Sequence, residues 1–186
     1  MKKLVLLGDS IRMLGYGNKV ADELRNEFIT WQPDDNCRFA QYTLRMLFDY
    51  KESISGADII HFNCGLWDMC DLFGDGPFTC IDEYCGTMQR IAKILQNYAK
   101  RVIFSTSTPP RPEKTDHSID RIIRYNEKIS KILSNQGIIV NDLFSVVYPH
   151  VEEYVRDDDL IHLTDAGISA CASSIVKAIR AASDTI

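Results

Sequence analysis

Ser10 stands directly after a short apolar segment that ends in Gly8 and Asp9. The run Leu4–Leu7 is typical of a buried strand in a parallel sheet, and the polar residues after it indicate a turn into a helix. Ligands of open α/β sheets bind at the carboxyl ends of the strands, so a serine on this turn can present its hydroxyl to a site. Serine is also a favoured helix N-cap, and this turn alone favours that structural role over a functional one.

A histidine with a neighbouring aspartate lies near the other end of the chain. Asp159 and His162 are three residues apart, just before a segment of helical spacing that begins at Thr164. The carboxylate can bond one ring nitrogen, fix the tautomer and stabilise the imidazolium. Alternatively, His162 bonds a backbone carbonyl while the aspartates favour the helix start. A serine hydroxyl needs an adjacent base to act as a nucleophile, and Ser10, His162 and Asp159 together supply nucleophile, base and orienting acid.

Strand-like and helix-like segments alternate along the chain and must position these residues. We expect strands at residues 3–7, 28–31, 57–65, 101–106 and 137–141, and helices at about 14–25, 40–50, 81–98, 119–133, 143–155 (broken) and 164–179. The alternation predicts an α/β fold, a single three-layer α/β/α sandwich with a five-stranded parallel sheet. The common strand order 2-1-3-4-5 is the expected one, and its carboxyl edge can bring the two ends of the chain together.

Composition excludes several classes of function. The chain has 186 residues, 45% apolar and 25% charged, with a net charge of −5, values typical of one globular domain. The sequence has no stripe of basic residues of the kind that indicates a nucleic-acid partner. The apolar run after Met1 is too short for a signal peptide or a membrane span, so we expect a cytoplasmic protein without a membrane partner unless a leader has been removed. The sequence leaves the oligomeric state open, a homo-oligomer included.

Metal and disulfide sites are not predicted. The six cysteines form no Cys-x-x-Cys pair and lack zinc-site spacing with the histidines, so we expect reduced thiols. His61 lies in the middle of a predicted strand and is expected in the core. His117 and His150 have no evident partner in the sequence, which makes them poor alternative bases.

Gly8-Asp9-Ser10 and Asp159-Leu-Ile-His162, in a chain of alternating strands and helices, resemble the SGNH hydrolases, also called GDSL esterases or lipases. The resemblance spans nearly the whole chain, so residues 1–186 are expected to form a single SGNH-hydrolase-like domain. It implies a flavodoxin-like sandwich and ester hydrolysis through an acyl-serine intermediate, with Ser10, His162 and Asp159 as catalytic residues. It also implies no metal and no organic cofactor.

The second motif of this family usually reads Asn-x-Gly-x-Ser-Gly-x-Thr. This chain keeps Asn36 and Thr43 but has Arg38 at the position of the first glycine. In the family that glycine donates its backbone N–H to the oxyanion hole. The resemblance therefore implies that the N–H groups of Ser10 and Arg38 hold the oxyanion, if the backbone of Arg38 can adopt the conformation of the glycine.

The third motif, usually Gly-x-Asn-Asp, aligns with Gly65-Leu66-Trp67-Asp68 and so has Trp67 in place of the asparagine. Asn63 lies two residues before Gly65. Its side chain either replaces the missing oxyanion donor or ties down the strand backbone, and the sequence does not distinguish these alternatives.

The resemblance and the composition favour a serine esterase for short acyl groups, in particular O-acetyl esters of a carbohydrate or another small molecule. Residues 66–79 read as a polar loop without an apolar lid. Candidate substrate-binding residues around the site are Asp9, Arg12, Gly65 and Trp67.

Two other classes of function remain. One is a non-catalytic carbohydrate-binding relative whose oxyanion hole has degraded. The other is a receiver-like signalling domain using Asp9 and Asp68, which would need a lysine after the fifth strand, where this chain has Asn141 and Asp142.

Overall fold

Five parallel strands form the central layer of the protein, seen in a computed structural model that describes residues 1–186. The strands are β1 (Lys2–Leu7), β2 (Phe28–Trp31), β3 (Ala57–Asn63), β4 (Ala99–Ser105) and β5 (Ile139–Asn141). Their order is β2-β1-β3-β4-β5 and every pair is parallel. This result confirms the predicted α/β class, the strand number and the order 2-1-3-4-5.

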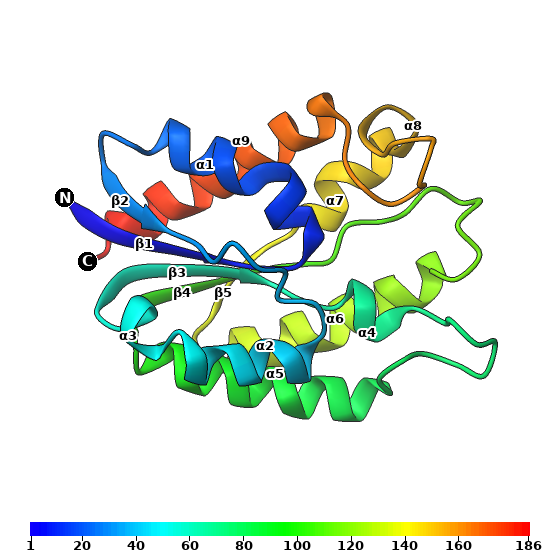
Figure 1. The fold of residues 1–186 in the computed structure, drawn as a ribbon, viewed down its shortest axis with the longest axis horizontal. Coiled ribbons are helices and arrows are strands. Elements are labelled where there is room, and N and C mark those ends of the chain that lie inside the picture. Colours follow the sequence, from blue (N-terminus) through cyan, green and yellow to red (C-terminus); the bar gives the residue numbers. More distant parts are fainter.

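Helices cover both faces of the sheet (Figure 1). One face carries η1 (Arg12–Tyr16), α1 (Gly17–Glu23), α7 (Leu143–Val147), η2 (Tyr148–His150), α8 (Val151–Tyr154) and α9 (Asp165–Ser183). The other face carries α2 (Ala40–Asp49), α3 (Lys51–Ile54), α4 (Leu66–Met69), α5 (Ile81–Gln96) and α6 (Ile119–Asn135). The protein is therefore the expected three-layer sandwich.

The central strands are buried because helices pack against both of their faces. Residues Leu4–Leu7 of β1 and Ile59, Ile60 and Phe62 of β3 are buried, and they belong to one continuous apolar core. A strand covered on both faces needs apolar side chains at successive positions, which explains the unbroken apolar run before Ser10. Burial of β1 within the sheet thereby sets the position at which the chain leaves the core, just before Gly8 and Ser10.

Element boundaries differ from the predicted ones at two places, whereas α2 begins at Ala40, as predicted. The chain becomes helical at Ser10, where a longer loop was expected, and Leu66–Met69 forms a short helix inside the predicted loop 66–79. Both differences lie just after the carboxyl end of β1 or β3.

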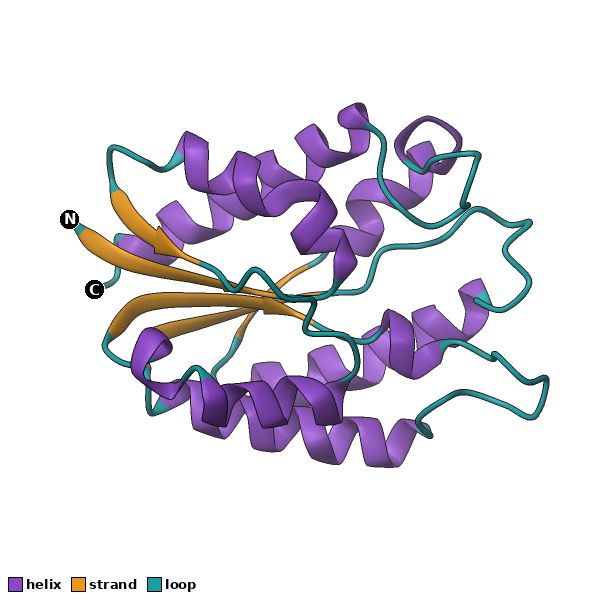
Figure 2. Ribbon diagram, viewed as in Figure 1, coloured by secondary structure: helices purple, strands orange, loops and turns teal.

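Long loops gather at the end of the sheet toward which the strands point, on the right in Figure 2. They follow β2, α4 and β4 and also precede α9, while the short turn after β1 ends at the same edge, so residues from both ends of the chain meet there. No helix of the structure is long and apolar enough to cross a membrane.

Two helical glycines allow a test of the packing between α9 and α8. A Cβ atom on Gly167 would lie 2.3 Å from the backbone oxygen of Tyr154, whereas one on Gly86 in α5 would meet nothing within 4 Å. We expect Gly167→Ala to lower the free energy of unfolding by about 1–3 kcal/mol, because the backbone must shift. Gly86→Ala, the matched control, should raise it by about 0.5–1 kcal/mol through helix propensity. Urea unfolding followed by circular dichroism measures both, and equal effects would contradict the contact.

Candidate active site

Ser10 stands on a tight turn at the carboxyl end of β1. The Asp9 carboxylate accepts the N–H of Ile11 at 3.0 Å, and the Asp9 carbonyl accepts the N–H groups of Arg12 and Met13 at 3.1 and 3.0 Å. These bonds start a helical turn directly after the strand, which leaves the Ser10 side chain only partly buried at the edge of the sheet. The serine is thus held by its neighbours in sequence, with its hydroxyl free to meet another segment.

The segment before α9 is a closed loop that carries His162. Val155 and Leu163 form an antiparallel bridge, and the N–H of Arg156 donates to the carbonyl of His162 at 2.8 Å. The N–H of Arg111, from the loop after β4, donates to the carbonyl of Leu160 at 2.9 Å. The loop is therefore fixed both at its base and at its tip.

The structure brings Ser10, His162 and Asp159 together in one hydrogen-bonded chain. His162 Nε2 lies 2.9 Å from Ser10 Oγ, and His162 Nδ1 lies 2.8 Å from Asp159 Oδ2. The other Asp159 oxygen accepts the N–H groups of Ile161 and His162 at 3.0 and 2.9 Å. An imidazole oriented in this way can take the proton of the serine hydroxyl and return a proton to a leaving group.

Asp159 stays ionised over a wide pH range. Partial burial acts to raise its pKa, but the N–H groups of His162 and Ile161 and the His162 ring outweigh this and lower the pKa to about 2. The carboxylate therefore carries its charge beside the imidazole at any pH at which the protein is expected to work.

The two residues predicted to complete an oxyanion hole with Ser10 are engaged elsewhere. The N–H of Arg38 donates to Asn36 Oδ1 at 2.8 Å, although its φ of 51° is the left-handed conformation that glycine would adopt. The Asn63 amide donates to Asp9 Oδ1 at 2.8 Å, and its oxygen accepts the Tyr16 hydroxyl at 2.5 Å. In the structure both groups make hydrogen bonds within the protein, whereas no hydrogen bond within the protein uses the N–H of Ser10, and the role of Arg38 and Asn63 as oxyanion donors stays a prediction.

Asp9 and Arg12 do not line a substrate site, contrary to the prediction, because their side chains are 0% and 1% exposed. Arg12 donates to the carbonyls of Pro33 and Asp35 at 3.0 and 2.7 Å and to that of Gly8 at 3.4 Å. It ties the Ser10 turn to the segment after β2. Burial raises the pKa of Asp9, an effect that the bonds from Asn63 and Ile11 partly offset. Both residues therefore stabilise the Ser10 turn through buried contacts.

Gly65 and Trp67, the other two predicted substrate-binding residues, differ in their placement. Gly65 is buried at φ 148°, and a Cβ atom there would lie 2.7 Å from Ser107 Oγ, so glycine is required for the backbone to pass. Trp67 is 43% exposed and lines a cavity together with Ser10 and His162. Only Trp67 is therefore placed to touch a substrate.

Two hollows of different size adjoin Ser10 and His162. The larger, of about 200 Å³, has apolar walls from Leu66, Trp67 and Ile161. The smaller, of about 30 Å³, is lined by Ile11, Leu14, Gly15, Arg156 and Leu163 as well as the two candidate catalytic residues. The segment 66–79, predicted to be polar, also exposes large apolar side chains: Trp67 and Leu72, which line the larger hollow, and Phe73 and Phe78.

The larger hollow contains a residue that the sequence analysis dismissed. His117 lines it with Lys114 and Asp116, and His117 Nδ1 lies 3.0 Å from Asp116 Oδ1. The prediction that His117 has no partner is wrong. The adjacent Asp116 was the only feature of the sequence that could have indicated a partner for His117.

His61 is buried in the core as expected, with Nε2 2.7 Å from Ser105 Oγ.

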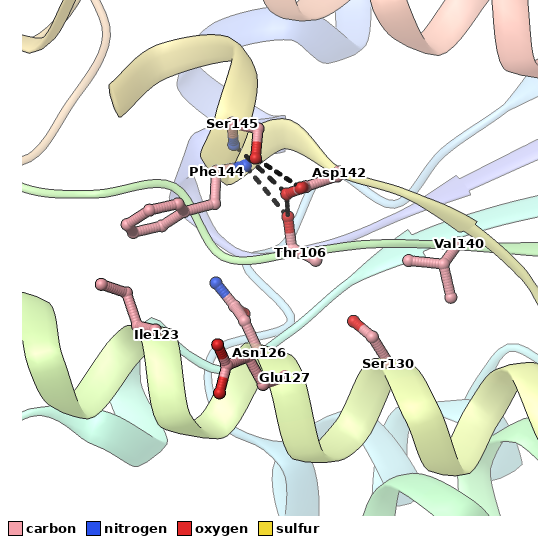
Figure 3. A pocket seen from close by; sticks show the side chains of 9 residues that line it. All are labelled: Thr106, Ile123, Asn126, Glu127, Ser130, Val140, Asp142, Phe144 and Ser145. Atoms are coloured by element: carbon pink, nitrogen blue, oxygen red, sulfur yellow. Dashed lines mark hydrogen bonds between the residues drawn. The ribbon is translucent and has the colours of Figure 1, made fainter. Parts of the chain in front are cut away.

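A further hollow lies between α6 and α7 beside β5, away from these residues (Figure 3). Asp142 there accepts the Thr106 hydroxyl at 2.9 Å and the N–H of Ser145 at 3.2 Å, so it caps α7.

No cluster of three or more His, Cys, Asp or Glu side chains could hold a metal ion. Asp9 and Asp68, the pair considered for a receiver-like domain, are both fully buried.

Comparison with known proteins supports the fold. No protein-family model matches the chain, and no curated protein sequence matches it. Among solved structures it is similar to Axe2, an acetylxylan esterase from Geobacillus stearothermophilus, with a TM-score of 0.75 and 16% identity over 95% of this chain and 93% of that one. The acetyl xylan esterase AlAXEase gives a TM-score of 0.76 and 19% identity over 95% and 99%. LAE5, an alpha/beta hydrolase enzyme from the metagenome of Lake Arreo, Spain, gives 0.77 and 17% over 95% and 94%.

Asp68, beneath the candidate site, should make stability depend on pH. Burial raises its pKa from 3.8 to about 6, so between these values the folded protein holds a proton that the unfolded chain has released. Stability then falls as pH rises through this window. We expect Asp68→Asn to remove this loss of stability. Between pH 4 and 7 its free energy of unfolding should rise by about 2–3 kcal/mol relative to that of the parent protein.

Urea unfolding at a series of pH values measures this difference. Asp75→Asn, which changes an exposed aspartate of the same loop, is the matched control and should follow the parent protein. A constant difference between Asp68→Asn and the parent across the window would contradict the expected protonation.

Proposed function

We propose that the chain is a serine esterase of the SGNH hydrolase type and that residues 1–186 form its single catalytic domain. The observation that carries the proposal is the contact of His162 Nε2 with Ser10 Oγ at 2.9 Å, with the Asp159 carboxylate on the other ring nitrogen. The three residues have the types and the order of contacts that acyl transfer through a serine requires.

In the proposed reaction, Ser10 Oγ attacks the carbonyl carbon of the ester while His162 takes the hydroxyl proton. The Asp159 carboxylate stabilises the resulting imidazolium, and the N–H of Ser10 faces the oxyanion. The tetrahedral intermediate collapses as His162 returns the proton to the leaving alcohol, which gives an acyl-serine. A water molecule, deprotonated by His162, then attacks the acyl carbon and releases the carboxylic acid.

The similar structures support this assignment. Axe2 variants described as catalytic mutants change a serine, an aspartate and a histidine, and they match this fold with TM-scores of 0.78, 0.79 and 0.78. The changed aspartate and histidine lie three positions apart in that enzyme, the spacing of Asp159 and His162 here. The shared fold, residue types and spacing favour the same division of roles.

The substrate we propose is a short-chain acyl ester, in particular an O-acetyl ester of a carbohydrate. The hollow of about 30 Å³ beside Ser10 has the volume of about one water molecule, enough for an acetyl methyl group but not for a long chain. The acetyl xylan esterases among the similar structures support the carbohydrate alcohol. The proposed chemistry needs no cofactor. A cytoplasmic location remains a prediction from the sequence.

One observation favours a second candidate, a non-catalytic carbohydrate-binding relative. The N–H of Arg38 and the amide of Asn63 are both engaged within the protein, so the Ser10 N–H is the one identified oxyanion donor. Removing one such donor from an enzyme costs about 10²–10³ in rate, which makes a weakened or lost activity the specific alternative.

Labelling with a fluorophosphonate separates the two candidates. We expect covalent modification at Ser10, found by mass spectrometry, because the reagent needs a serine activated by a base. Ser10→Ala should abolish labelling and lower ester hydrolysis by at least about 10³-fold. Ser173→Ala, which changes an exposed serine of α9, should label like the parent protein. A parent protein that neither reacts nor hydrolyses esters would favour the binding protein.

The acyl preference can be tested with p-nitrophenyl esters of increasing chain length. We expect the highest kcat/KM for acetate and a fall of about tenfold or more by octanoate, since the smaller hollow cannot take added methylene groups without displacing its walls. The two p-nitrophenyl esters must be compared at concentrations at which neither forms micelles. A higher kcat/KM for octanoate would contradict the assignment of this hollow to the acyl group.

A further inference from the structure

A second histidine–aspartate pair faces Ser10 across the larger hollow. His117 and Asp116 line the cavity of about 200 Å³ to which Ser10 and His162 also belong. Asp116 Oδ1 lies 3.0 Å from His117 Nδ1 and 3.3 Å from Lys114 Nζ. The proposed hydrolysis uses only the first pair, His162 and Asp159, so the second pair has no role in the chemical steps.

The free nitrogen of His117 is directed to no group of the protein. Its Nδ1 is taken by the Asp116 carboxylate, which favours the tautomer with the proton on Nδ1 and the lone pair on Nε2. Nε2 makes no hydrogen bond within the protein, but it is accessible to solvent. It is therefore a solvent-accessible acceptor on a side chain that lines the cavity and is only 9% exposed.

The pair is held in place by contacts with the opposite loop. The carbonyl of Asp116 accepts the N–H of Asp71 at 2.7 Å. Arg121 of α6 reaches the same region, donating to the carbonyl of Met69 at 3.0 Å and to Asp71 Oδ2 at 3.3 Å. These bonds join the two loops that form the cavity walls, so the position of His117 is fixed before any ligand binds.

The composition of the cavity argues for a ligand with both an apolar face and a hydroxyl group. Trp67 and Ile161 supply apolar wall, whereas His117 supplies a hydrogen-bond acceptor. An acyl chain in this cavity would leave the acceptor without a partner, and an unpaired buried polar group opposes binding. A polyhydroxylated alcohol satisfies both parts, because its ring faces are apolar and its rim carries O–H groups.

We infer that the larger cavity receives the alcohol part of the ester and that one of its hydroxyl groups donates a hydrogen bond to His117 Nε2. This inference rests on the proposed function, with the acyl group in the smaller hollow. His117 is then a specificity-determining residue: it selects alcohols with a free hydroxyl near the ester, and takes no part in bond cleavage. Asp116 acts through it by fixing the ring, as a positioning residue.

Paired substrates test the inference. We expect His117→Phe to raise KM for a methyl xyloside monoacetate with free hydroxyls by about fivefold, the value of one neutral hydrogen bond, with kcat little changed. For p-nitrophenyl acetate, which has no such hydroxyl, kcat/KM should stay within about twofold. His117→Gln, whose amide oxygen can accept, should recover part of the lost affinity. His150→Phe changes a histidine whose ring packs at a tilt against Tyr154, and should leave the kinetics on both substrates unaffected.

An equal loss on both substrates in His117→Phe would overturn the inference, because the ring would then only shape the site. Unchanged KM for the monoacetate would overturn it as well. A binding measurement separates this failure from failure of the esterase proposal. In the Ser10→Ala background, titration of the monoacetate followed by NMR should give a dissociation constant about fivefold higher with His117→Phe. Equal constants, or no saturable binding without the second change, would refute the His117 contact whatever the activity.

Discussion

The hydrogen bond between His162 Nε2 and Ser10 Oγ joins residues 152 positions apart in sequence. It exists because β1 is an interior strand of a parallel sheet and the loop before α9 lies at the same end of that sheet, so both ends of the chain reach the carboxyl side of the strands. Loop closure over such a distance is costly in entropy and must be offset by burial elsewhere. The continuous apolar core under β1 and β3 supplies that burial, which makes the site a consequence of the sheet.

Below Ser10, a buried polar network replaces part of the apolar packing. Tyr16 donates to Asn63, Asn63 donates to Asp9, and Asp9 accepts the N–H of Ile11 on the nucleophile turn. Such a chain is stabilising only when its members are paired, since each unpaired buried group would cost about 1–3 kcal/mol. Arg12 adds bonds to three backbone carbonyls. The side chains that flank Ser10 in sequence therefore fix its backbone and leave recognition to the loops above.

This arrangement explains which features the sequence predicted. Apolar periodicity reports burial directly, so the strands followed from it, whereas their order was expected only because 2-1-3-4-5 is common in such folds. The spacing of Asp159 and His162 is short enough for local geometry to bring them together. The direction of Asp9, Arg12 and Asn63 depends on partners 20 to 54 residues away, which no local pattern encodes. His117 was missed for the same reason, because its adjacent aspartate is visible in the sequence but the cavity that both face is not.

The two hollows beside Ser10 assign different tasks to different parts of the chain. The smaller is built largely from the nucleophile turn and the loop of His162, segments whose geometry the proposed chemistry already constrains. The larger is built mainly from residues 66–72 and 114–117, in the segments after β3 and β4, and none of these residues hydrogen-bonds to Ser10 or to the loop of His162. An esterase on this fold can therefore keep a fixed acyl side while its alcohol side changes. Under the proposed function, Trp67 and His117 lie on the alcohol side, so changes in their identity are expected to alter which alcohol is accepted before they alter the chemical step.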